Sequence, residues 1–185
     1  PPTPIGELMR SISAPAPSPG PAMPEMDEGA QEEVRRAVLA EIAAEDSRQP
    51  MAALYQDFNV RCRMRGVEGG LSVDDFRARL AMARAGIVDA EGWDEAMRLA
   101  ASLPEEMLSP FLGLARAARE GLDCPSDQQI AQLYGTSSLG RAKRMLGFIE
   151  EKGLIVCRTD LSGKRTISLP HLGWTTAPGD RKCTR

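Results

Sequence analysis

The feature that most constrains this fold is a change in the spacing of apolar residues at Gly153. Before it, the sequence SSLGRAKRMLGFIEEK has apolar residues at helical spacing, which predicts a helix over residues 137–152. After it, the sequence GLIVCRTDLSGKRTISLP changes to a period of two residues, which predicts a pair of strands. Residues 160–163 place a glycine in a turn, so residues 154–169 are expected to form a β-hairpin.

A shorter helix is predicted immediately before this unit. Ser126 is a favourable N-cap, and the sequence DQQIAQLY at residues 127–134 places its large apolar side chains on one side. Gly135 then supplies the tight turn that helix-turn-helix units have between their two helices. The second helix is expected to expose positive charge along its N-terminal half, where a DNA groove would meet it.

Five parts therefore follow one another: a short helix, a glycine turn, a basic helix, the motif E-x-K-G-L-I, and a hairpin with D-x-x-G-x-R. This order resembles the winged helix-turn-helix superfamily, especially its MarR-like and GntR-like bacterial regulators. The resemblance covers about residues 104–170. It implies that the basic helix lies in the major groove of DNA, and that the hairpin wing meets the minor groove or the adjacent backbone.

Hydroxyl and basic side chains of these parts are the candidate DNA contacts. They are Thr136, Ser137, Ser138, Arg141, Lys143, Arg144, Lys164 and Arg165. The last two belong to the wing, and the others to the turn and the basic helix. An arginine can bind guanine through two hydrogen bonds, whereas lysines and hydroxyl groups mainly hold phosphates and set the register. The alternative is an ordinary solvated basic surface.

A first folded module is predicted over residues 28–90, as three helices. Apolar residues at helical spacing predict two helices separated at Pro50, and Ser72 is an N-cap for the third. This module is similar to the winged helices of origin-recognition initiators at Tyr55, Phe58, Cys62, Leu71, Ser72, Phe76 and Leu80. No convincing wing hairpin follows Ile87 in the sequence.

The remaining segments complete the predicted division of the chain. Residues 1–27 are an acidic, proline-rich tail and linker, and residues 91–120 form a helical bridge that is split at Pro104. Residues 121–175 are the C-terminal winged helix-turn-helix, and residues 176–185 a basic tail. The expected fold class is mainly α-helical with a small β-hairpin wing, as tandem winged-helix-like modules joined by helices.

The formal net charge of −3 hides an uneven distribution along the chain. Residues 1–33 contain one basic and six acidic residues, whereas residues 136–185 contain ten basic and four acidic residues. A DNA-binding protein needs a basic face, not a basic total, so this face is expected at the C-terminal end. Arg61, Arg63 and Arg65 are expected to be ordinary surface arginines, with a second DNA surface as the alternative.

No site for chemistry is predicted. The four cysteines include no C-x-x-C pair and there is one histidine, so neither a metal nor another cofactor is expected. His171 has no identifiable nucleophile or carboxylate partner, and Trp174 is expected to cover the edge of the winged domain. No run of about 20 apolar residues indicates a membrane span. We therefore expect a cytoplasmic, nucleoid-associated protein that is not an enzyme.

The preferred hypothesis is sequence-specific binding of double-stranded DNA, by a bacterial transcriptional regulator or replication-associated factor that acts by occupancy and recruitment. The alternative is a protein-interaction scaffold that uses winged helices in a chromosome-organisation or transcription complex. Residues 5–12, IGELMRSI, have apolar residues at helical spacing. They are a candidate docking helix for a protein partner, with a disordered tail as the other interpretation.

Overall fold

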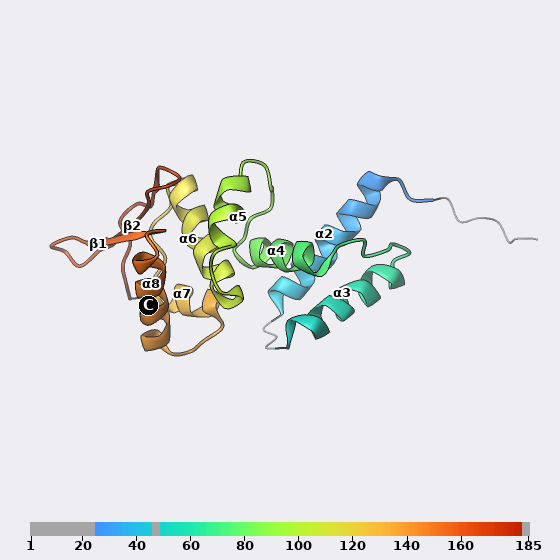
Figure 1. The fold of residues 1–185 in the computed structure, drawn as a ribbon, viewed down its shortest axis with the longest axis horizontal. Helices are drawn as coiled ribbons and strands as arrows, with labels where there is room; N and C mark the ends of the chain where they lie inside the picture. Colours follow the sequence, from blue (N-terminus) through green and yellow to red (C-terminus); the bar gives the residue numbers. More distant parts are fainter. Residues whose placement is uncertain (1–24, 46–48, 183–185) are drawn as a thin grey trace, which may run out of the picture.

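The computed structural model describes residues 25–45 and 49–182 of the chain (Figure 1). The helices are α2 (Glu28–Ala44), α3 (Met51–Met64), α4 (Val73–Arg84), α5 (Asp94–Ala100), the 3₁₀ helix η1 (Glu105–Met107), α6 (Leu108–Glu120), α7 (Asp127–Tyr134) and α8 (Leu139–Glu151). The strands are β1 (Val156–Thr159), β2 (Arg165–Leu169) and β3 (Trp174–Thr175). The expected fold class, mainly α-helical with a small β-hairpin wing, is confirmed. The candidate docking helix at residues 5–12 lies outside the described residues.

Helices α2, α3 and α4 form an N-terminal module with an apolar core of its own. Asp27 and Ser72 cap α2 and α4 by accepting hydrogen bonds from the backbone N–H groups of Ala30 and Asp75, at 2.7 and 3.0 Å. The core residues are Val38, Leu39, Ile42, Leu54, Phe58, Cys62, Phe76 and Leu80. The described part of this module contains no strand, and therefore no wing.

Helix α6 is the centre of the C-terminal unit. Ten of its thirteen residues are buried, as expected for a helix that is apolar nearly all round. It packs on α4, α5, α7, β2 and β3. At Gly113 a Cβ atom would lie 2.5 Å from Cδ1 of Leu133, so the glycine allows α7 to approach α6 closely. Helix α6 is thus part of the C-terminal core, and not only a bridge as the division at residues 91–120 predicts.

The two units share helix α4 and lie side by side along it (Figure 1). One side of α4 belongs to the N-terminal core, whereas Ala81, Ala85 and Ile87 belong to the core around α6. Nε of Arg77 also lies 3.1 Å from Oε1 of Glu105, which adds an ion pair across the junction. The junction between the units is therefore packed.

The sheet has the strand order β1–β2–β3, and both pairs are antiparallel. Strands β1 and β2 form the predicted hairpin, in register from Val156 opposite Ser168 to Thr159 opposite Arg165. We call this hairpin, residues 156–169, the wing. Strand β3 is two residues long and was not predicted from the sequence.

Trp174 of β3 covers the edge of the C-terminal unit, in agreement with the expectation. Its ring packs against that of Trp93, with centroids 5.5 Å apart. The guanidinium group of Arg119 lies over both rings, 5.0 Å from the centroid of Trp93 and 5.5 Å from that of Trp174. These contacts attach β3 to the helices.

Residues 176–182, the described part of the predicted basic tail, pack back against the C-terminal unit. Thr176 is buried, and the backbone N–H of Cys124 donates to the carbonyl of Ala177 at 2.9 Å. A Cβ atom at Gly179 would collide with the carbonyl oxygen of Cys124, so only glycine fits at this crossing. The described end of the chain is therefore part of the fold.

Candidate nucleic-acid interface

Helices α7 and α8 are joined by a tight turn that local hydrogen bonds hold in place. Ser126 forms a capping box at the start of α7, and Gly135 ends that helix with a φ of 73°. The hydroxyl of Thr136 accepts a hydrogen bond from the backbone N–H of Ser138, at 3.1 Å. The hydroxyl of Ser138 in turn accepts one from the N–H of Arg141, at 3.3 Å, and so caps α8. These bonds determine where α8 begins.

Helix α8 buries one face and exposes most of the predicted contact residues. The buried residues are Ala142, Met145, Leu146 and Ile149. The exposed ones are Ser137, Ser138, Arg141, Lys143 and Arg144, and Thr136 is half-buried. Helical spacing places Gly140, Arg144 and Gly147 opposite the buried face. Arg144 therefore stands on the most outward line of the helix, between two residues without side chains.

Arg141 is oriented by an aromatic ring. Its guanidinium carbon lies 5.8 Å from the centroid of Tyr134, in the last turn of α7. Arg141 and Arg144 both line a small hollow of about 170 Å³ beside α8, whose other walls include Tyr134 and Phe148. The two guanidinium groups thus share one side of the helix with aromatic side chains.

The tip of the wing is held by the carboxylate of Asp160. This group accepts hydrogen bonds from the N–H and hydroxyl of Ser162, at 2.9 and 2.6 Å, and from the N–H of Lys164, at 3.0 Å. The bond from the Ser162 hydroxyl contributes most to holding the pKa of Asp160 below its ordinary value. Gly163 closes the turn with a φ of 87°. Lys164 follows with its side chain exposed.

Arg165 does not reach the outer surface of the wing, so the expectation that it contacts DNA is wrong. Its side chain is 5% exposed; Nη1 donates to Oδ1 of Asp127 and Nη2 to the carbonyl of Pro125, both at 2.7 Å. The side chain turns inward because Arg165 shares the buried face of β2 with Ile167 and Leu169. It joins the wing to the start of α7.

A second exposed cation of the wing was missed from the sequence. Arg158 lies on β1, opposite Thr166 of β2, and its side chain is exposed. The available signal was its position inside the strand-forming segment, since a basic residue on a wing hairpin is a candidate phosphate contact. With Lys164, it gives the wing two exposed positive charges.

The exposed cations of α8 and the wing share one property. Within the part of the chain that the structure describes, none of these five forms an ion pair: Arg141, Lys143, Arg144, Arg158 and Lys164. The charge of Lys164 is close enough to Asp160 to help lower the pKa of that carboxyl, whereas the other four side chains present unpaired charge to solvent.

The arginine cluster of α3 is different because carboxylates offset most of its charge. Nη1 of Arg61 lies 2.7 Å from Oε1 of Glu45, and Nη2 lies 2.8 Å from Oδ2 of Asp57. Hydrogen bonds to Glu45 and then Asp57 raise the pKa of Arg61. Arg65 pairs with Glu41 at 2.7 Å. Of the three arginines only Arg63, which is exposed and forms no ion pair among the described residues, would offer free charge to a second DNA surface.

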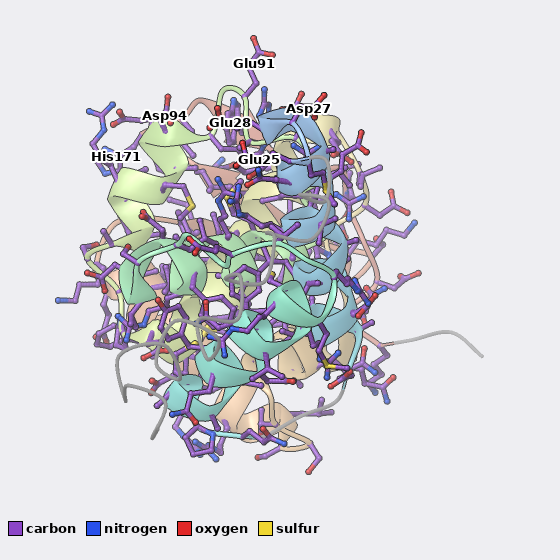
Figure 2. All side chains as sticks on the ribbon, turned by 90° about the vertical axis from the view of Figure 1, so that its right-hand side faces the viewer. Glu25, Asp27, Glu28, Glu91, Asp94 and His171 are labelled. Carbon is purple, nitrogen blue, oxygen red and sulfur yellow. The ribbon has the colours of Figure 1, made fainter. Side chains whose placement is uncertain are left out.

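Several acidic side chains at the starts of α2 and α5 lie in the upper part of the molecule, away from the turn before α8. Figure 2 shows Glu25, Asp27, Glu28, Glu91 and Asp94 along the upper edge of the molecule. His171 lies at the upper left of the same view. The turn between α7 and α8 lies at the lower edge in Figure 1, which keeps the same vertical axis. The labelled acidic side chains are thus on the other side of the molecule from the turn that precedes α8.

No group of three or more His, Cys, Asp or Glu side chains is arranged to hold a metal ion within residues 25–45 and 49–182. Nor does this part of the chain contain a helix with the length and apolar character that crossing a membrane requires. Comparisons of the chain with protein-family models, with curated proteins and with solved structures found no match.

Proposed function

We propose that this protein binds double-stranded DNA through α8 and the wing, and acts by occupancy and recruitment. One observation carries the proposal: the exposed cations of these two elements form no ion pair among the described residues. Such cations can contact phosphates without first breaking an ion pair, and each contact releases counterions from DNA. The wing and α8 belong to one core, so they would meet a duplex together.

The geometry favours different roles for the cations. Arg144 is on the outward line of α8 and would approach base edges in the major groove, where a guanidinium group can bind guanine bidentately. Lys143, Arg158 and Lys164 would hold phosphates on either side. A transcriptional regulator or replication-associated factor of the winged helix-turn-helix superfamily fits these roles, with sequence-specific binding.

Fluorescence-anisotropy titration against a random duplex, at several salt concentrations, tests the proposal. If Arg141, Lys143, Arg158 and Lys164 each contact a phosphate, log K should fall with log salt with a slope of about −3.6. Lys143→Ala should reduce the slope by about one. Arg36→Ala is the matched control, because Arg36 is an exposed α2 residue without an ion pair among the described residues. No binding at low salt, or an equal effect of the control, would overturn the proposal.

The second candidate is a protein-interaction scaffold, and the acidic side chains in the upper part of Figure 2 favour it. An acidic surface repels DNA and attracts basic partners. The same titration distinguishes the two functions. A chain without salt-dependent DNA affinity that forms a stable complex with a basic protein is a scaffold.

A further inference from the structure

The surface of the N-terminal module is hollowed into an apolar groove of about 630 Å³ between α3 and α4. Met51, Tyr55 and Val60 line the α3 side, and Val73 lines the α4 side. Val60 is 48% exposed and Val73 is 42% exposed, although both are aliphatic. The polar side chains of Gln56, Asn59, Arg63 and Arg77 also line the groove. A groove with exposed apolar side chains among polar ones can receive an amphipathic helix.

The groove is a fixed feature of the module. Helices α3 and α4 both pack on α2. The hydroxyl of Tyr55 donates to the carbonyl of Leu71 at 2.6 Å, and its ring packs on that of Phe76 with centroids 5.4 Å apart. The apolar wall that Tyr55 provides is therefore held in place without an occupant, and binding there would need little rearrangement.

We propose that residues 5–12 of this same chain occupy the groove. Their sequence, IGELMRSI, has Ile5, Leu8, Met9 and Ile12 at the spacing i, i+3, i+4 and i+7. This is the spacing at which an amphipathic helix lays its apolar face into a hydrophobic groove. The groove supplies the apolar surface that such a segment needs in order to fold.

Residues 13–24, which connect residues 5–12 to α2, are long enough to let that segment reach the groove. Residues 13–24 contain five prolines in twelve residues, and a proline-rich chain extends about 3.1 Å per residue, or roughly 37 Å in total. Helix α2 is about 25 Å long, from its 17 residues. The start of α2 and the end of α3 lie at the same end of the module (Figure 1). The whole groove is therefore within reach.

The tether also favours this occupant over a second copy of the chain. A connection whose length matches the distance to the groove gives a segment an effective concentration far above that of another molecule in a dilute solution. Residues 5–12 of the same chain are therefore expected to occupy the groove in preference to those of a second copy.

Hydrogen exchange measured by mass spectrometry on the full chain tests the proposal. Amides of residues 5–12 should exchange at least about tenfold more slowly than in an unstructured peptide. Val60→Asp places a charge in the groove at an exposed position, and should return these amides to the unstructured rate. Val88→Asp, at a residue that is 79% exposed and outside the groove, is the matched control. Protection of α2 reports that both variants are folded.

Three outcomes would overturn the proposal. The first is exchange of residues 5–12 at the unstructured rate in the unmodified chain. The second is protection that Val60→Asp and Val88→Asp leave equally intact. The third is protection that disappears on dilution, since that would assign the segment to the groove of a second copy.

Discussion

Replacement of Gly147 by alanine should move the stability of the protein and its affinity for DNA in opposite directions. Gly147 lies inside α8, and a Cβ atom there would have no atom within 4 Å. Alanine is favoured over glycine in a helix interior by about 1 kcal/mol, because the unfolded chain loses less conformational freedom. For a chain of 185 residues this should raise the Tm by about 2–4 °C.

The effect on DNA binding follows from the position of Gly147 beside Arg144, on the outward line of α8. If this line enters the major groove, an added methyl group keeps the helix backbone away from the bases and weakens the contact of Arg144. A good bidentate contact contributes about 1–3 kcal/mol, so a loss of roughly tenfold in affinity is expected.

Calorimetry and anisotropy titration on the same preparation measure the two effects. Gly29→Ala is the matched control, because Gly29 is an exposed helical glycine in the first turn of α2, where a Cβ atom would make only an ordinary contact of 3.6 Å. The control should leave the affinity unchanged. An unchanged affinity for Gly147→Ala would refute the close approach of this face, and an unchanged Tm would refute the helix argument.

Two further predictions concern the wing. Arg165→Ala removes the ion pair to Asp127 and should lower the free energy of unfolding by about 3 kcal/mol, seen as a lower urea midpoint; an unchanged midpoint would contradict the structural role of Arg165. Burial, and then the charge of Glu150, raise the pKa of Cys157 from 9.0 to about 11, so its alkylation should be slow at pH 8 and should accelerate as the pH approaches 11. Because the fold favours the neutral thiol, this group's contribution to stability is complete below pH 9 and is lost as the pH rises through 11. Glu150→Gln should shift the alkylation profile to lower pH, and a profile centred near pH 9 in the unmodified protein would contradict the pKa shift.

The sequence predicts α7, α8 and the wing because the residues that define these elements lie within the elements or next to them in the chain. The N-cap at Ser126 and the turn at Gly135 mark both ends of α7 within a few residues, and the change of period at Gly153 separates helix from hairpin. Strand β3 was not predicted because two residues are too few to show an alternation of apolar and polar side chains. Its pairing depends on β2, which the turn after Leu169 brings alongside.

The incorrect role for Arg165 has a different origin. The alternation that predicts β2 also places Arg165 on the same face as Ile167 and Leu169, so the sequence contained a signal that this side chain turns inward. The sequence alone does not show which residue pairs with Arg165. Asp127 lies 38 residues earlier in the chain, and only the packing of the sheet against α7 brings the two charges together.

This buried ion pair bears on how the proposed interface would work. The guanidinium group of Arg165 bonds Asp127 and the carbonyl of Pro125 at the start of α7, while its backbone N–H donates to the carbonyl of Gly179 at 2.9 Å. It thereby connects the wing to the helix that positions α8. Two surfaces that are to meet one duplex need a constant separation, because each contact is lost when its partner surface moves. An arginine that only touched phosphate would contribute one contact, whereas the buried one maintains the geometry on which the exposed cations of α8 and the wing depend together.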